Sequence, residues 1–117
     1  MTGAELTAEL VRLSRLLDDS LRAMRDRGRL LAELERDYRH ARALAWIETD
    51  GTAKQREDDV NSMTADQRYA RDIANHDRQA AQEAVRNYRA QLSALQTIAN
   101  VERAEMELTR TGPELVA

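Results

Sequence analysis

The chain has 117 residues, of which 33% are charged and only 3% aromatic, and its formal net charge at pH 7 is −3. This length fits one domain, expected to span residues 1–117. The absence of cysteine excludes a disulfide framework and favours a reducing, cytoplasmic environment. No apolar run approaches the roughly 20 residues that a membrane-spanning helix needs, so no membrane partner is expected.

The first predicted helix runs from about residue 5 to residue 48. Apolar or aromatic side chains recur in it every seven residues, the period of a coiled coil. These are Leu10, Leu17, Met24, Leu31, Tyr38 and Ala45. A flanking row contains Leu16, Leu30 and Leu44. Together the rows form an apolar arc wider than contact with one helix requires, which predicts burial against two neighbouring helices.

A compact connector is predicted after residue 48. Gly51 suits the left-handed turn that ends a helix. Two capping-box patterns follow, each able to start a new helix: Thr52 with Gln55, and Thr64 with Gln67. We therefore expect a short helix at about 53–60, a break near residues 61–63, and another helix from about residue 65.

The last predicted helix covers about residues 65–110, and Thr111, Gly112 and Pro113 should end it. Residues 112–117 are expected to form a flexible tail. Two long helices of similar length with a compact connector predict an all-α fold, a long antiparallel, coiled-coil-like helical hairpin. Because a lone hairpin would leave the flanking leucines in water, we expect a homodimer that forms a four-helix bundle.

Trp46 is the only tryptophan, and it lies beside the predicted connector. We expect its indole to fill the corner of the hairpin together with Gly51, against Val60, Met63 or Tyr69. The alternative is an exposed anchor for a partner, because tryptophan is enriched at binding hot spots.

The sequence offers little support for catalysis, and no enzyme, cofactor or metal site is expected. It has no cysteine, only two histidines and no glycine-rich phosphate loop. Arginines do form an outward row with seven-residue spacing and two neighbours; they are Arg15, Arg22, Arg29, Arg36, Arg25 and Arg39. Such a row could contact phosphates, or it could be a solvated face paired with acids on the same helix.

Two segments, residues 38–57 and 92–112, resemble small helical proteins of actinobacterial bacteriophages. Proteins of this kind mostly have no assigned function, and some are encoded near recombination or single-strand DNA genes. The resemblance implies a phage accessory protein and carries over no site residues. Trp46 at a hairpin corner is also similar to the secreted WXG hairpin family, but Gly51 is five residues away and the export signal is missing.

These patterns lead to one functional hypothesis and one alternative. We expect a non-enzymatic helical protein of the bacterial cytoplasm that binds a host or phage protein. The alternative is a nucleic-acid-binding accessory factor in phage recombination or replication, which would use the arginine row.

Overall fold

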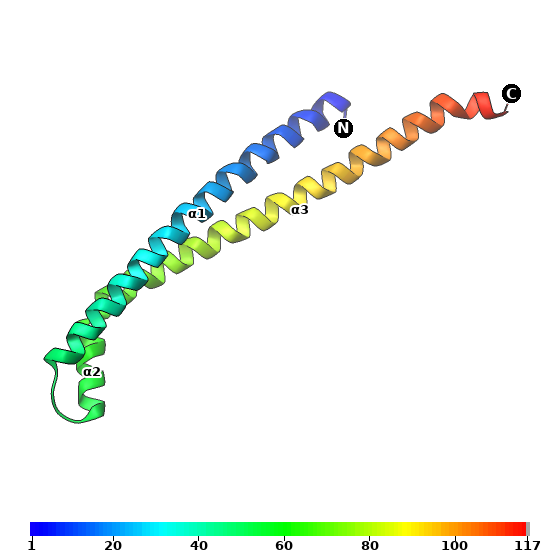
Figure 1. Ribbon diagram of the computed structural model, residues 1–117. Coiled ribbons are helices and arrows are strands. Elements are labelled where there is room, and N and C mark those ends of the chain that lie inside the picture. The colour runs from blue at the N-terminus through cyan, green and yellow to red at the C-terminus, as the bar shows by residue number, and fades with distance from the viewer. Residues whose placement is uncertain (117) are drawn as a thin grey trace. The chain divides into compact units, whose positions relative to one another are not determined.

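The computed structural model describes residues 1–116, with side chains described up to Thr111. It contains three helices: α1 (Gly3–Glu48), α2 (Ala53–Met63) and α3 (Ala65–Val116) (Figure 1). No strand occurs among the described residues. The expected all-α helical hairpin with a short connecting helix is therefore confirmed.

The first helix begins at Gly3, earlier than predicted, because a capping box forms at its start. The backbone N–H of Thr2 donates to the Glu5 carboxylate, and the N–H of Glu5 donates to the Thr2 hydroxyl. The reciprocal bonds satisfy donors that a helix start leaves free. The Thr-x-x-Glu pattern that signals this start is visible in the sequence.

The start of α2 matches the sequence prediction. Gly51 has φ +103°, in the left-handed region that favours glycine. Thr52 then caps α2 through the predicted reciprocal bonds with Gln55. The corner therefore follows from local turn and capping chemistry.

The second predicted capping box does not form, and the prediction of a break at residues 61–63 is wrong. The Thr64 hydroxyl donates back to the carbonyl of Val60 at 2.7 Å, as does the Thr64 N–H at 3.0 Å. These bonds extend α2 to Met63, so that Thr64 alone separates it from α3. Gln67 makes no capping bond, and its Oε1 is buried without a hydrogen-bond partner.

The predicted end of the last helix is also wrong, since α3 continues to Val116. Hydroxyl groups support its final described turns: Thr109 donates to the carbonyl of Glu105 and Thr111 to that of Glu107. The expected tail at residues 112–116 is thus helical, and residue 117 lies outside the described part.

The chain divides into two compact units. The terminal unit combines residues 1–20 with the segment from residue 84 onward, and the corner unit comprises residues 21–83. The terminal unit buries Leu6, Leu13 and Val85. The buried residues of the corner unit are smaller on average: Ala45, Val60, Thr64, Ala74 and Ala81.

Candidate interaction site

Each unit has a groove along one side of its pair of long helices. In the terminal unit, the terminal groove is lined by Met1, Glu9, Leu13, Gln91, Ala94 and Leu95. Residues seven apart lie on one face of a helix. Heptad spacing from the lining residues therefore identifies further side chains on the groove-facing side of each helix. Leu16 follows Glu9 by seven residues, and Ile98 and Val101 follow Gln91 and Ala94 in the same way.

The one carboxylate that lines the terminal groove is neutralised. Arg12 Nε donates to Glu9 Oε2 at 3.0 Å, and a second guanidinium nitrogen contacts the other carboxylate oxygen. This hydrogen bond from Arg12 holds the pKa of Glu9 below its ordinary value. Beyond this pair, the side of the terminal groove is mainly apolar, with Leu16 half-buried and Ile98 and Val101 exposed.

The corner unit has an equivalent groove with different chemistry. The corner groove is lined by Leu34, Asp37, Asp66, Gln67 and Ala70. Asp37 has only a long, exposed ion pair with Arg36 at 3.4 Å, and Asp66 forms no ion pair among the described residues. Two carboxylates thus flank an apolar floor that also contains the unpaired Gln67 oxygen.

Large apolar side chains border the corner groove. Leu30 and Leu44 lie seven residues before and after Asp37 on α1, and Ile73 lies seven residues after Asp66 on α3. Their exposed fractions are 47%, 48% and 45%. The two leucines of the flanking row predicted from the sequence are therefore exposed here, on the side of the groove.

At the corner, Trp46 is half-buried, and its three candidate neighbours differ in exposure. Met63 and Tyr69 are exposed by 48% and 69%, whereas Val60 is fully buried. The guanidinium of Arg56 covers the indole, 4.8 Å from the ring centroid. The same group donates to the carbonyl of Trp46 at 2.7 Å, near the end of α1. A cation therefore packs on the indole at the corner, since one guanidinium can both cap a carbonyl and stack on a ring.

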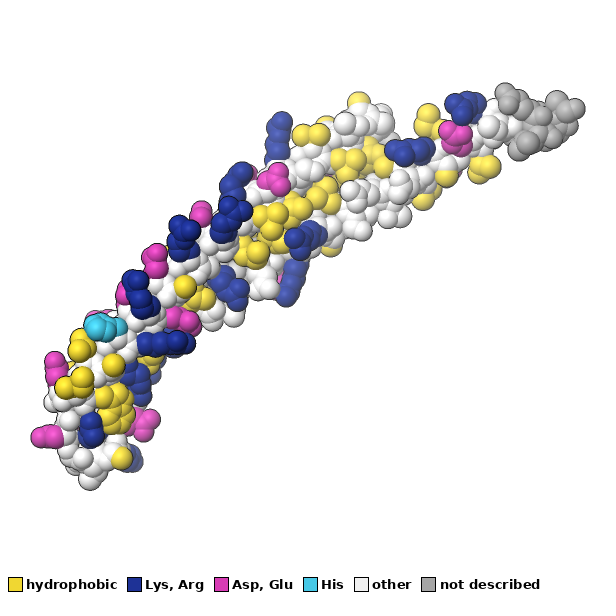
Figure 2. Space-filling model, viewed as in Figure 1, with side chains coloured by type: hydrophobic (Ala, Val, Ile, Leu, Met, Phe, Trp, Pro, Cys, Tyr) yellow, Lys and Arg dark blue, Asp and Glu magenta, His cyan; other side chains and the backbone are white. Residues whose placement is uncertain are grey.

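The predicted arginine row lies on the outer side of α1, and all six members are exposed. Figure 2 shows basic side chains spaced along this helix with acidic ones between them. Among the described residues, Arg15, Arg25, Arg29 and Arg39 form no ion pair. Pairing with acids on the same helix, one of the two interpretations of the row, is therefore not found for Arg15 and Arg29. Arg15 belongs to the terminal unit and the others to the corner unit.

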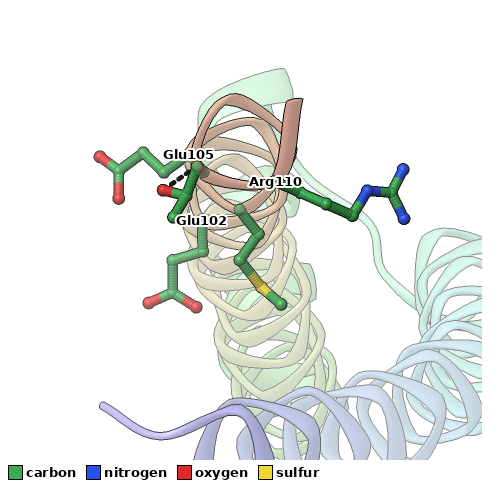
Figure 3. A pocket seen from close by; sticks show the side chains of 5 residues that line it. Glu102, Glu105 and Arg110 are labelled. Atoms are coloured by element: carbon green, nitrogen blue, oxygen red, sulfur yellow. Dashed lines mark hydrogen bonds between the residues drawn. The ribbon is translucent and has the colours of Figure 1, made fainter. Parts of the chain in front are cut away.

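A third depression lies on a single helix, near the end of α3. It is lined by Glu102, Glu105, Met106, Thr109 and Arg110. Figure 3 shows the two glutamates pointing to one side and Arg110 to the other, with the bond from the Thr109 hydroxyl to Glu105 dashed. All its walls come from one helix, so it is open rather than enclosed.

No cluster of three or more potential metal-ligating side chains occurs among the described residues, and none of the described helices is long and apolar enough to span a membrane. Sequence reasoning missed the two grooves, although seven-residue spacing from Asp37 to Leu30 and Leu44 could have indicated the second. No protein-family model, curated protein or solved structure matches the chain.

Proposed function

We propose that this chain is a non-enzymatic helical interaction protein that binds a host or phage protein in the cytoplasm. The observation that carries the proposal is that more large apolar side chains are exposed than apolar side chains are buried among the described residues. Seven are buried, whereas twelve large ones are exposed. Several of these recur at heptad spacing beside the two grooves, as expected of helix surfaces that bind another helix. The phage setting rests on the resemblance of residues 38–57 and 92–112.

The terminal unit is the better surface for the homodimer. Leu16, Ile98 and Val101 lie in heptad register with residues that line its groove, and the carboxylate of Glu9 in that groove is paired with Arg12. Two such sides can face each other without bringing uncompensated charges together. These features favour a four-helix bundle formed around Leu16, whereas Leu30 and Leu44 lie beside the acidic groove of the other unit.

Light scattering coupled to gel filtration tests this dimer. The parent chain should have about twice the 13.3 kDa chain mass, and the double variant Ile98→Gln, Val101→Gln should be a monomer. Both residues are exposed in the single chain, so the helical circular dichroism should persist. Ile47→Gln, at an exposed apolar position of the corner unit, is the control and should remain dimeric. A parent chain that is monomeric at micromolar concentration would contradict the proposed dimer.

The arginine row supports a second candidate, nucleic-acid binding, because Arg25 and Arg29 are exposed and form no ion pair. Phosphate contacts release counterions, so binding should weaken as salt rises. Changing both residues to Gln should weaken DNA binding. It should also reduce the steepness of the plot of log binding constant against log salt concentration by about two. The absence of binding by the parent chain at about 50 mM salt, where phosphate contacts are strong, would remove this candidate.

A further inference from the structure

We propose that the corner groove binds a basic amphipathic helix of a partner protein, with a lysine or arginine of that helix between Asp37 and Asp66. This rests on the proposed function as a protein-interaction module, and it names the chemistry of the partner. The proposal depends on the apolar border of the groove and on the distribution of charge around it.

The apolar border fits one additional helix. Leu30 and Leu44 from α1 and Ile73 from α3 are each about half exposed. Seven-residue spacing from Asp37 and Asp66 puts them beside the groove, in which Leu34 and Ala70 lie. A helix placed along such a groove contacts both walls with side chains at i, i+3, i+4 and i+7. Without an occupant these three large side chains stay in water.

The charged side chains that line the groove are of one sign, because Asp37 and Asp66 face it without any lining cation. Asp26 and Glu33 lie one helical turn from Leu30 at the α1 border of the groove. One cation, Arg27, lies seven residues before Leu34, and its guanidinium donates to the carbonyl of Asp77. The outer side of the same α1 segment instead carries Arg22, Arg25, Arg29, Arg36 and Arg39. An apolar surface framed by carboxylates is complementary to a helix with apolar and basic side chains.

The same charges argue against a second copy of the chain as the occupant. Two corner grooves facing each other would bring Asp37 and Asp66 of one copy against acids of the other, and like charges in contact cost several kcal/mol. The arginine row of a second copy has the right charge, but it lacks the large apolar side chains that would cover Leu30, Leu44 and Ile73. A partner helix with both features satisfies the site.

Binding of a designed peptide to the full chain tests the proposal. The probe is a helix-forming peptide with leucines at i, i+3 and i+7 and lysines beside them, measured by fluorescence anisotropy. A second peptide has glutamates in place of the lysines. We expect the lysine peptide to bind in a salt-sensitive manner and the glutamate peptide to bind at least about tenfold more weakly.

A pair of isosteric variants locates the site. Asp37→Asn with Asp66→Asn should weaken binding of the lysine peptide by about tenfold or more. Asp58→Asn with Asp59→Asn changes the charge by the same amount at exposed positions of α2 and should leave binding unchanged. Circular dichroism should show equal helix content in both. Equal loss in the two variants, equal binding of the two peptides, or no binding of the lysine peptide would overturn the proposal.

One further measurement separates this proposal from the dimer. If a second copy occupied the corner groove, Leu30→Gln with Leu44→Gln would turn the dimer into a monomer, and the inference would be wrong. If the groove takes a basic partner helix, this variant should remain dimeric and lose the lysine peptide. The test of the terminal dimer is therefore independent of the test of the corner groove.

Discussion

The terminal and corner units use the same heptad pattern with different side chains. The terminal unit packs Leu6, Leu13 and Val85 and pairs the carboxylate of Glu9 with Arg12. The corner unit packs mainly alanines, and its groove keeps two carboxylates. Seven-residue periodicity therefore predicts which side chains share a face, whereas the identity of each residue decides whether that face is self-complementary or suited to a partner of opposite charge.

The small core of the corner unit is supplemented by arginines that cross between its helices. Arg42 donates to the side-chain oxygen of Asn61 at 2.8 Å, and Arg27 donates to the carbonyl of Asp77 at 3.3 Å. The guanidinium of Arg71 stacks on Tyr38 with a 4.6 Å separation from the ring centroid. Long arginine stems cover apolar surface while their charged ends bond to polar groups. Such contacts can hold two helices together where alanines leave little volume to bury.

The largest expected effect comes from truncating the leucine core of the terminal unit. Leu13 is only 1% exposed, and Leu13→Ala should lower the free energy of unfolding by about 3 kcal/mol, through lost burial and a residual cavity. Urea unfolding followed by circular dichroism measures the change. Val11→Ala, at an exposed position on the same helix, is the control and should cost far less. A cost below about 1 kcal/mol for Leu13→Ala would mean that this core does not hold the unit together.

Removing the arginine at the corner should have an intermediate effect. Arg56→Ala deletes the stacking on Trp46 and the bond to its carbonyl, and should destabilise the fold by about 2 kcal/mol. Acrylamide should then quench Trp46 fluorescence more strongly than in the parent chain. Lys54→Ala, which removes a neighbouring exposed cation, should leave the quenching unchanged. Unchanged quenching in Arg56→Ala would show that the guanidinium does not cover the indole.

A substitution at the turn that strains the backbone should lower the free energy of unfolding somewhat less. Gly51 has a positive φ, and a Cβ at this position would lie 2.7 Å from Gln55 Oε1, the atom that accepts the Thr52 N–H. Gly51→Ala should therefore strain the turn and disturb the cap of α2, at a cost of about 1–2 kcal/mol. Gly3→Ala meets no neighbour and should be tolerated. Equal melting temperatures for the two variants would argue against a strained turn.

The smallest expected effect is the pH dependence of stability that comes from Glu9. This carboxylate of the terminal groove is paired with an arginine. The hydrogen bond from Arg12 lowers the pKa of Glu9. A folded-state pKa below the unfolded one means that the pair stabilises the fold at neutral pH, and that this stabilisation is lost as pH falls through the lowered pKa. NMR titration of the Glu9 carboxyl should show the shift. Arg12→Gln should return the pKa to its ordinary range, and no difference between the two proteins would contradict the pairing.

The sequence predicted those features that depend on local rules. The long heptad rows, the left-handed turn at Gly51 and the cap at Thr52 all follow from short-range spacing. The Thr64 pattern failed because a threonine hydroxyl can either accept a bond from the next helix or donate back to the preceding turn, and it does the latter. The contact of Arg56 with Trp46 joins residues ten apart, and no periodic pattern specifies it. The chemistry of the grooves required knowing how α1 and α3 align within each unit.

Sedimentation equilibrium of the parent chain tests most directly the claim that its exposed heptad rows are interaction surfaces. At micromolar concentration and moderate salt, we predict a mass of about twice 13.3 kDa, with conversion to the single-chain mass when Ile98 and Val101 are both changed to Gln. A parent chain that stays at the single-chain mass across the concentration range would contradict the claim.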